Sequence, residues 1–172
     1  MKSESGRIAD DGMTIQELVQ STKKMGRKIE GAPVVYLTKS ELKPKSELVR
    51  FTTETPSSGD ETYHQIVEFY WVDVSKTKDR GHGVLVKTAS GRTGYIKKLD
   101  QRNFPVAVRC SCKDYQFTWA RANKLEGAFT CPRFPVIKTK GKRAPRNPQQ
   151  TPGVCKHLLG VFKKLRTEGF IR

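Results

Sequence analysis

Two short clusters of cysteine and histidine constrain this chain more than any other feature of its sequence. One residue separates Cys110 from Cys112, one residue separates Cys155 from His157, and residues 113–154 lie between the two pairs. Three thiolates and one imidazole are the ligand types and the ligand number of a closed tetrahedral zinc site, which leaves no position for a catalytic water. The pattern therefore predicts one structural Zn²⁺ ion held by all four residues.

Other roles for the cysteines are open at this stage. Four cysteines could form two disulfides, but the N-terminus lacks the apolar stretch of a secretion signal, so we expect an intracellular, cytoplasmic chain. In a reducing compartment, close Cys and His groupings more often hold metal than form disulfides. Free cysteines also serve as buried packing residues. Cys131, between the two pairs, is read first as a spare thiol, with a rival ligand or a crosslinking site as alternatives.

The length and the apolar pattern favour an α+β protein with a modest core. No apolar run approaches the roughly 18 residues that a bilayer crossing needs, so no membrane contact is expected. Composition divides the chain into a flexible lead (1–13), a helix with a β-rich region (14–105) and a zinc-binding region with a long basic loop (106–172). The middle part should form a small, mainly antiparallel sheet.

An N-terminal helix is predicted over residues 14–28. Thr14 and Glu17 have the spacing of a capping box, which marks a helix start. Apolar residues then recur at helical spacing on one stripe: Ile15, Leu18, Val19, Met25 and Ile29. Such a stripe must pack against another element.

Six segments rich in β-branched or aromatic residues are candidate strands: 34–37, 48–53, 63–74, 84–88, 94–98 and 106–109. The short segment 89–92 predicts a hairpin between the fourth and the fifth. After Cys112, residues 114–125 predict a short helix or an extended aromatic stretch. Residues 128–153 have the composition of a loop, and a final helix opens at His157.

The arrangement around the two pairs resembles the SWIM zinc finger, whose pattern is C-x-C, a variable spacer and C-x-H. The resemblance covers roughly residues 106–165, with a strand before the first pair and a helix after the second. It implies a SWIM-like ββα knuckle with Cys110, Cys112, Cys155 and His157 as the zinc ligands. The segments 114–117, 147–148 and 152–159 look like the long-spacer version in predicted proteins of tailed bacteriophages.

Positive charge dominates the chain and concentrates near the predicted metal site. Lys and Arg number 33 against 17 Asp and Glu, for a formal net charge of +16, and no carboxylate lies between Glu126 and Glu168. Phosphate is the natural counterpart of such a surface. The candidate residues for binding nucleic acid or an acidic partner are Arg133, Lys138, Lys140, Lys142, Arg143, Arg146, Lys163 and Lys164. Tyr115, Phe117 and Trp119 could stack on bases, or could form the core of the zinc site.

These features favour a non-catalytic, zinc-stabilised binding module that engages DNA or RNA through its basic loop. The alternative is a structural subunit of a larger assembly, such as a bacteriophage virion, with protein partners at its helix and sheet. An enzyme is not expected, because both ligand pairs are committed to metal and no small-molecule site is recognisable. Asp114 could accept a hydrogen bond from His157 or serve a turn. His64 and His82 are read as ordinary surface or packing residues.

Overall fold

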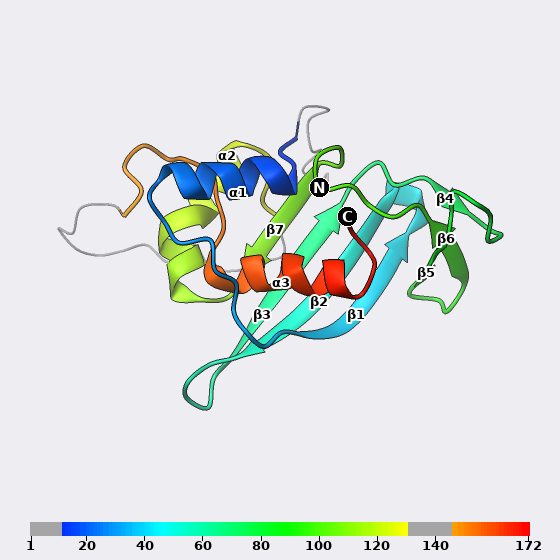
Figure 1. The fold of residues 1–172 in the computed structure, drawn as a ribbon, viewed down its shortest axis with the longest axis horizontal. Coiled ribbons are helices and arrows are strands. Elements are labelled where there is room, and N and C mark those ends of the chain that lie inside the picture. The colour runs from blue at the N-terminus through cyan, green and yellow to red at the C-terminus, as the bar shows by residue number, and fades with distance from the viewer. Residues whose placement is uncertain (1–11, 131–145) are drawn as a thin grey trace, which may run out of the picture.

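The computed structural model describes residues 12–130 and 146–172, and over these residues the chain has the predicted α+β fold (Figure 1). The helical elements are α1 (Ile15–Lys24), a 3-10 turn (Pro44–Ser46), a π-helical turn (Tyr115–Trp119), α2 (Ala120–Leu125) and α3 (Lys156–Thr167). The strands are β1 (Tyr36–Lys43), β2 (Leu48–Pro56), β3 (Thr62–Phe69), β4 (Val74–Ser75), β5 (Val84–Lys87), β6 (Thr93–Ile96) and β7 (Val106–Cys110). None of the helices in this described part is both long and apolar enough to cross a membrane.

The larger sheet has the strand order β1-β2-β3-β7, and each neighbouring pair is antiparallel. Period-two alternation places Phe51, Val67 and Val108 on one buried face of this sheet. Helix α3 crosses in front of the sheet in Figure 1, and its buried stripe of Leu158 and Leu165 completes the same core. The strand that leads to the first cysteine pair is therefore held in register by β3.

Helix α1 begins as predicted and ends earlier than predicted. Thr14 and Glu17 form the reciprocal capping box, but the last helical residue is Lys24, not residue 28. The chain leaves the helix through Gly26, whose φ of +72° is a left-handed conformation that glycine adopts without steric cost. Ile29 consequently lies beyond the helix and is 46% exposed.

The segment after α1 passes very close to α3. A Cβ atom placed on Gly160 would lie 2.8 Å from the carbonyl oxygen of Ala32, and one on Gly31 would lie 2.7 Å from the backbone nitrogen of Gly160. The Ala32 N–H donates to the Lys156 carbonyl at 2.8 Å. The backbone of residues 31–32 therefore packs directly against the backbone of α3, and this close approach requires glycine at positions 31 and 160. Helix α3 is consequently held between this segment and the sheet.

The smaller sheet has the order β4-β6-β5 and contains the predicted hairpin, with Lys87 opposite Thr93. One strand prediction was wrong, because residues 63–74 do not form one continuous strand. Strand β3 ends at Phe69, and Trp71 adopts a left-handed φ of +61° before β4 begins. A left-handed conformation is unfavourable for a Trp residue. The next residue partly offsets this cost, because the Val72 N–H donates to the Glu47 carbonyl at 2.9 Å.

Candidate metal centre

The fold brings the four predicted ligands into one buried cluster. The ligand atoms of Cys110, Cys112, Cys155 and His157 all lie within 4.8 Å of one another. Cys110 is the last residue of β7, Cys155 is the N-cap of α3, and His157 lies in the first turn of that helix. The cluster therefore joins the sheet edge to the start of the last helix.

Hydrogen bonds from neighbouring elements explain how each pair is positioned. The Ser111 N–H donates to the His64 carbonyl at 2.9 Å, and the His64 N–H donates to the Ser111 hydroxyl at 2.9 Å. This exchange extends the pairing of β3 and β7 by one residue and lets the chain turn between Cys110 and Cys112. The cysteine side chains consequently point to the same side.

The second pair is positioned by the turn at Gly153. The Asn123 side chain accepts from the Gly153 N–H and donates to its carbonyl, each at 2.9 Å. A Cβ atom on Gly153 would lie 2.5 Å from the Trp119 ring, so the close approach requires glycine. The Val154 N–H then donates to the Thr22 hydroxyl of α1 at 2.9 Å. Three helical elements thus fix the chain just before Cys155.

The spacing of the donor atoms fits a single tetrahedral ion. The His157 Nδ1 atom lies 3.8 Å from the Cys110 sulfur and 4.0 Å from the Cys155 sulfur. Bond lengths of about 2.3 Å to sulfur and about 2.0 Å to nitrogen would place tetrahedral ligand atoms roughly 3.5 to 3.8 Å apart. The donor set could therefore hold one metal ion, with Nδ1 as the imidazole ligand atom.

Hydrogen bonds to the sulfur atoms form a shell around the cluster. The Gln65 amide donates to the Cys110 sulfur at 3.7 Å, and the Tyr115 N–H donates to the Cys112 sulfur at 3.3 Å. The Gln65 carbonyl oxygen accepts from Thr53 at 2.9 Å and from Thr55 at 3.1 Å, which fixes the amide orientation. Donors to thiolate sulfur stabilise its negative charge and orient a ligand for metal.

Sequence reasoning missed this polar shell. Thr53, Thr55 and Gln65 are fully buried or nearly so, on strand positions that face the core. The signal was available in the alternation of β2 and β3, because inward positions at one end of an otherwise apolar face carry polar residues. Buried polar groups require partners, so such a cluster predicts a polar site beside it.

The shifted pKa values of the cysteines in the metal-free cluster indicate that the site favours a bound cation. Burial raises the pKa of the Cys110 thiol to about 12 and raises that of Cys155 well above its ordinary value. Hydrogen bonds from Cys110 and Cys155 lower the pKa of Cys112. Without metal the buried site favours one thiolate and two thiols, because three uncompensated negative charges would be poorly solvated. A divalent cation would offset two of the three thiolate charges, and the hydrogen bonds to the sulfur atoms would stabilise the remaining negative charge.

The aromatic residues after Cys112 belong to the core of this site. Tyr115 and Trp119 are each 1% exposed, and the Tyr115 hydroxyl donates to the Val108 carbonyl at 2.8 Å. Of the two roles left open for these two rings, stacking on bases and packing in the core of the site, their burial agrees with the core role. Phe117 is half-buried on a shallow surface pocket. The Tyr63 ring covers His157 at a centroid distance of 4.7 Å.

Asp114 contacts groups other than the candidate ligands. Its carboxylate accepts from Arg27 at 3.0 Å and from the Thr118 hydroxyl at 3.3 Å. The Arg27 guanidinium also lies 5.9 Å from the centre of the Trp119 ring. Asp114 therefore ties the chain after α1 to the π-helical turn, which is a packing role.

The predicted basic residues divide into two groups. Arg133, Lys138, Lys140, Lys142 and Arg143, together with Cys131, lie outside the described residues. Arg146 and Lys163 are exposed, whereas the Lys164 ammonium pairs with the Glu168 carboxylate at 2.7 Å. Among the described candidates, Arg146 and Lys163 therefore offer the more available charge.

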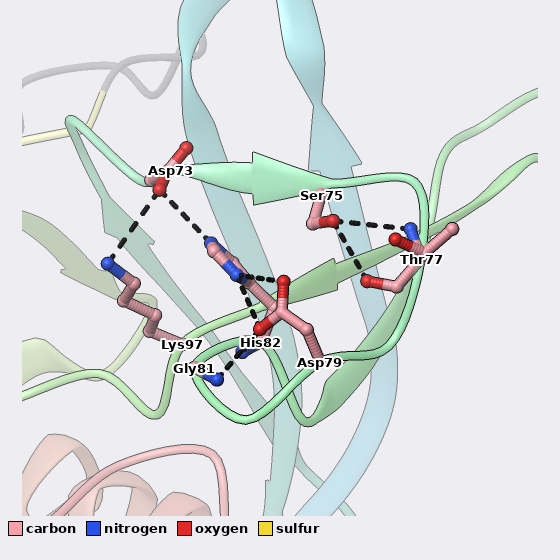
Figure 2. Close-up of polar contacts among 7 residues, drawn as sticks. All are labelled: Asp73, Ser75, Thr77, Asp79, Gly81, His82 and Lys97. Carbon is pink, nitrogen blue, oxygen red and sulfur yellow. Dashed lines mark hydrogen bonds and ion pairs between the residues drawn. The ribbon is translucent and has the colours of Figure 1, made fainter.

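A second polar cluster surrounds His82 in the small sheet (Figure 2). The His82 Nδ1 atom lies 3.0 Å from Asp79, and the Nε2 atom lies 3.0 Å from Asp73. Asp79 also accepts from the N–H groups of Gly81 at 2.7 Å and His82 at 2.8 Å. His82 thus closes the turn between β4 and β5, which sequence reasoning left as an ordinary position.

Comparisons with protein-family models, with curated proteins and with solved structures find no significant match for this chain. The structural observations that bear on function are therefore those of the chain itself, the buried Cys₃His cluster first among them.

Proposed function

We propose that the chain is a non-catalytic binding module stabilised by one zinc ion. The observation that carries the proposal is the buried cluster of Cys110, Cys112, Cys155 and His157. Soft thiolate ligands with one imidazole in tetrahedral number favour Zn²⁺ over the hard cations Mg²⁺ and Ca²⁺. The ion would crosslink β7 to α3 and leave no coordination position for a reacting water.

The SWIM-like character of the module is part of the same proposal. Strand β7 before the first pair and helix α3 after the second support it. The long segment between the pairs would then be an insertion whose ends the metal holds together. Closure of a long loop costs entropy that grows only slowly with length, so a metal site can retain such an insertion.

We further propose nucleic acid as the partner of the basic segment. The formal net charge is +16, and the sequence from residue 127 to residue 167 contains no acidic side chain. Lysine and arginine contacts to phosphate release counterions, so affinity of this kind falls steeply with salt and carries little sequence information. The module would bind through residues 133–146, with its fold secured by the zinc site.

Metal analysis tests the first part of the proposal. Protein purified without chelator should contain one zinc ion per chain by mass spectrometry of the metal, and Cys112→Ser should reduce the bound zinc substantially. The Cys131→Ser variant is the matched control, since Cys131 is expected to be a spare thiol. Full-length protein that is folded and holds no zinc would overturn the assignment.

Salt-dependent binding of short DNA and RNA duplexes and single strands tests the second part. Replacing Lys138, Lys140, Lys142 and Arg143 by Gln should weaken binding and flatten the salt dependence. The control replaces four exposed cations of the small sheet by Gln: Lys76, Lys78, Arg80 and Lys87. Equal losses in the two variants would show that net charge alone drives binding and would sink the assignment to residues 133–146.

A further inference from the structure

An open groove of about 600 Å³ runs between α1 and α3, away from the metal centre. Its walls come from both helices, from the segment after α1 and from the turn that precedes β7. In Figure 1, α1 lies above α3 and near β7, the edge strand of the large sheet. A groove of this volume has the size of a site for several bound side chains.

The floor of the groove is apolar. It is formed by Ile15, Val19, Ile29, Leu159 and Phe162. Ile15, Leu159 and Phe162 are nearly covered, so the accessible apolar surface comes from Val19, which is half-buried, and from Ile29. Ile29 is 46% exposed because the chain has already left α1. The early end of α1 therefore moves one residue of its predicted stripe from the core to a surface groove, where it can contact a partner.

The rim of the groove is cationic. Arg102, Lys163 and Arg166 line it, and none of the described residues that line it is acidic. Arg166 donates to the Gln101 side chain at 2.8 Å, which holds its guanidinium at the rim. Asp100 lies just outside, with its carboxylate 3.9 Å from Arg102. The groove thus combines an apolar floor with a net positive edge.

We propose that this groove binds an acidic amphipathic helix of a partner protein. The apolar floor would receive side chains at the i, i+3, i+4 and i+7 positions of that helix, and Asp or Glu beside them would meet the rim cations. Nucleic acid fits the groove less well, because the sugar-phosphate backbone has no apolar stripe and the exposed lining residues offer no aromatic ring for base stacking.

The groove and the residues that carry the proposed function lie in different parts of the fold. The groove uses α1 and the outward side of α3, whereas the zinc ligands lie at the buried N-terminal end of α3. A module of this design would bind nucleic acid with residues 133–146 and an acidic protein helix with the groove. The two activities should therefore be separable by mutation.

Selection from a random library tests the proposal. Yeast-displayed random peptides of about 16 residues, enough for roughly four helical turns, are sorted against the fluorescent full-length, zinc-loaded protein at physiological salt. The enriched peptides should be acidic, with apolar residues at helical spacing. Their affinity should fall about 10-fold or more for the Ile29→Asp variant, because a charge on the floor would be desolvated on binding.

Two adjacent lysines supply a matched pair of charge variants. Lys163→Gln should weaken the selected peptides several-fold, whereas Lys164→Gln should have little effect because Lys164 pairs with Glu168 at 2.7 Å. Circular dichroism and zinc content of each variant establish that the fold is kept. Arg102→Gln, at an exposed position, gives a second rim variant should Ile29→Asp fail to fold.

Three results would overturn the proposal. Enriched peptides that lack apolar spacing and bind the Ile29→Asp variant equally well would show attraction by net charge alone. An absence of enriched acidic peptides would exclude this class of partner. Short single-stranded DNA that shifts the methyl NMR signals of Val19 and Ile29 would assign the groove to nucleic acid. Loss of DNA binding without loss of peptide binding would instead count only against the proposed nucleic-acid function.

Discussion

The metal centre and the His82 cluster are built by the same means and differ in solvent exposure. Each gathers titratable side chains around one imidazole, although Asp73 and Asp79 come from the same short segment as His82. The metal-centre residues are all buried, with His157 only 6% exposed. Around His82 the Asp73 and Asp79 side chains are 69% and 50% exposed, although the His82 side chain itself is only 14% exposed. The same kind of contact therefore has very different consequences for stability in the two places.

Burial decides what each cluster requires. Three thiolates away from water need a cation and hydrogen-bond donors, because an uncompensated buried charge is strongly destabilising. The exposed carboxylates near His82 are already solvated, and exposed ion pairs add little to stability. The metal centre should consequently control the fold, and the His82 cluster should only adjust one turn.

Loss of a metal ligand should give the largest effect. Cys155→Ser removes a candidate ligand at the N-cap of α3. We expect a loss of about 3 kcal/mol or more in the free energy of unfolding, because metal binding contributes to folding directly. Hydrogen exchange should show lost protection in β7 and α3, with the hairpin of β5 and β6 less affected.

The Cys131→Ser variant and a chelator provide the controls for this prediction. Cys131→Ser should leave the free energy of unfolding nearly unchanged. Chelation of wild-type protein should reproduce the exchange pattern of Cys155→Ser. Equal destabilisation of the small sheet and of α3 would remove the contrast between the two regions.

A pair of glycine variants compares the packing of the two regions directly. In Gly160→Ala the new methyl group meets backbone atoms of Ala32 at 2.8 and 3.0 Å, which cannot move without displacing the chain. In Gly94→Ala the methyl group meets the Leu42 Cδ2 atom at 2.8 Å and the Val74 Cγ1 atom at 3.0 Å, which are ends of side chains. We expect a cost of about 2 to 3 kcal/mol for Gly160→Ala and about 1 kcal/mol or less for Gly94→Ala.

Urea unfolding of the two variants measures this difference in the free energy of unfolding. Alanine also has lower backbone entropy in the unfolded chain than glycine, which partly offsets the clash at both positions. A larger cost at Gly94 than at Gly160 would contradict the view that α3 is the more tightly clamped element.

Loss of the Gln65 side chain, one of two donors to the Cys110 sulfur, should have an intermediate effect. Gln65→Met keeps the approximate volume of the side chain and removes both the donor to the sulfur and the acceptor for Thr53 and Thr55. We expect zinc affinity to fall about 10-fold or more, as for other groups that orient a metal ligand. Unfolding should cost about 1 to 3 kcal/mol less, because two buried hydroxyls lose their partner.

Chelator competition measures the affinity, and Gln116→Met is the matched control. Gln116 donates to the Ser111 carbonyl beside the site and not to a sulfur atom. Equal losses of zinc affinity in both variants would mean that local packing, not the hydrogen bond to sulfur, supports the ligand.

The two regions also differ in how far the sequence predicts them. The grouping of Cys110, Cys112, Cys155 and His157 was predicted from spacing alone, because the residue types that can bind metal are few. The capping box at Thr14 and the hairpin of β5 and β6 were equally local patterns. The His82 cluster was missed, since Asp and His are common in surface turns and the contact to Asp73 spans nine residues.

Other errors had a local conformational cause. The stripe of apolar residues predicted a helix through residue 28, but the left-handed Gly26 ends it and turns Ile29 toward the groove. The strand predicted over 63–74 is interrupted at Trp71, whose φ is left-handed. Strand propensity does not predict this break, because Trp is common in strands. The alternation of β3 indicates that Gln65 is buried, but its contact with Cys110 follows only when β3 and β7 are placed in register, with Gln65 opposite Cys110.

The smallest effect should be the pH dependence of His82. Hydrogen bonds to Asp73 and Asp79 raise the pKa of His82 above 6.5, since only the imidazolium can donate from both ring nitrogens. The stabilisation is fully present below pH 6.5, the unfolded-state value, and is lost as the pH rises through the raised pKa. NMR titration of the His82 ring should therefore give a pKa above 6.5, and Asp73→Asn should lower it. Asp60→Asn, in an exposed turn, is the control and should leave the His82 pKa unchanged. A wild-type His82 pKa of 6.5 or below would show that solvent screens these ion pairs completely. The His82 cluster would then contribute nothing to the free energy of unfolding.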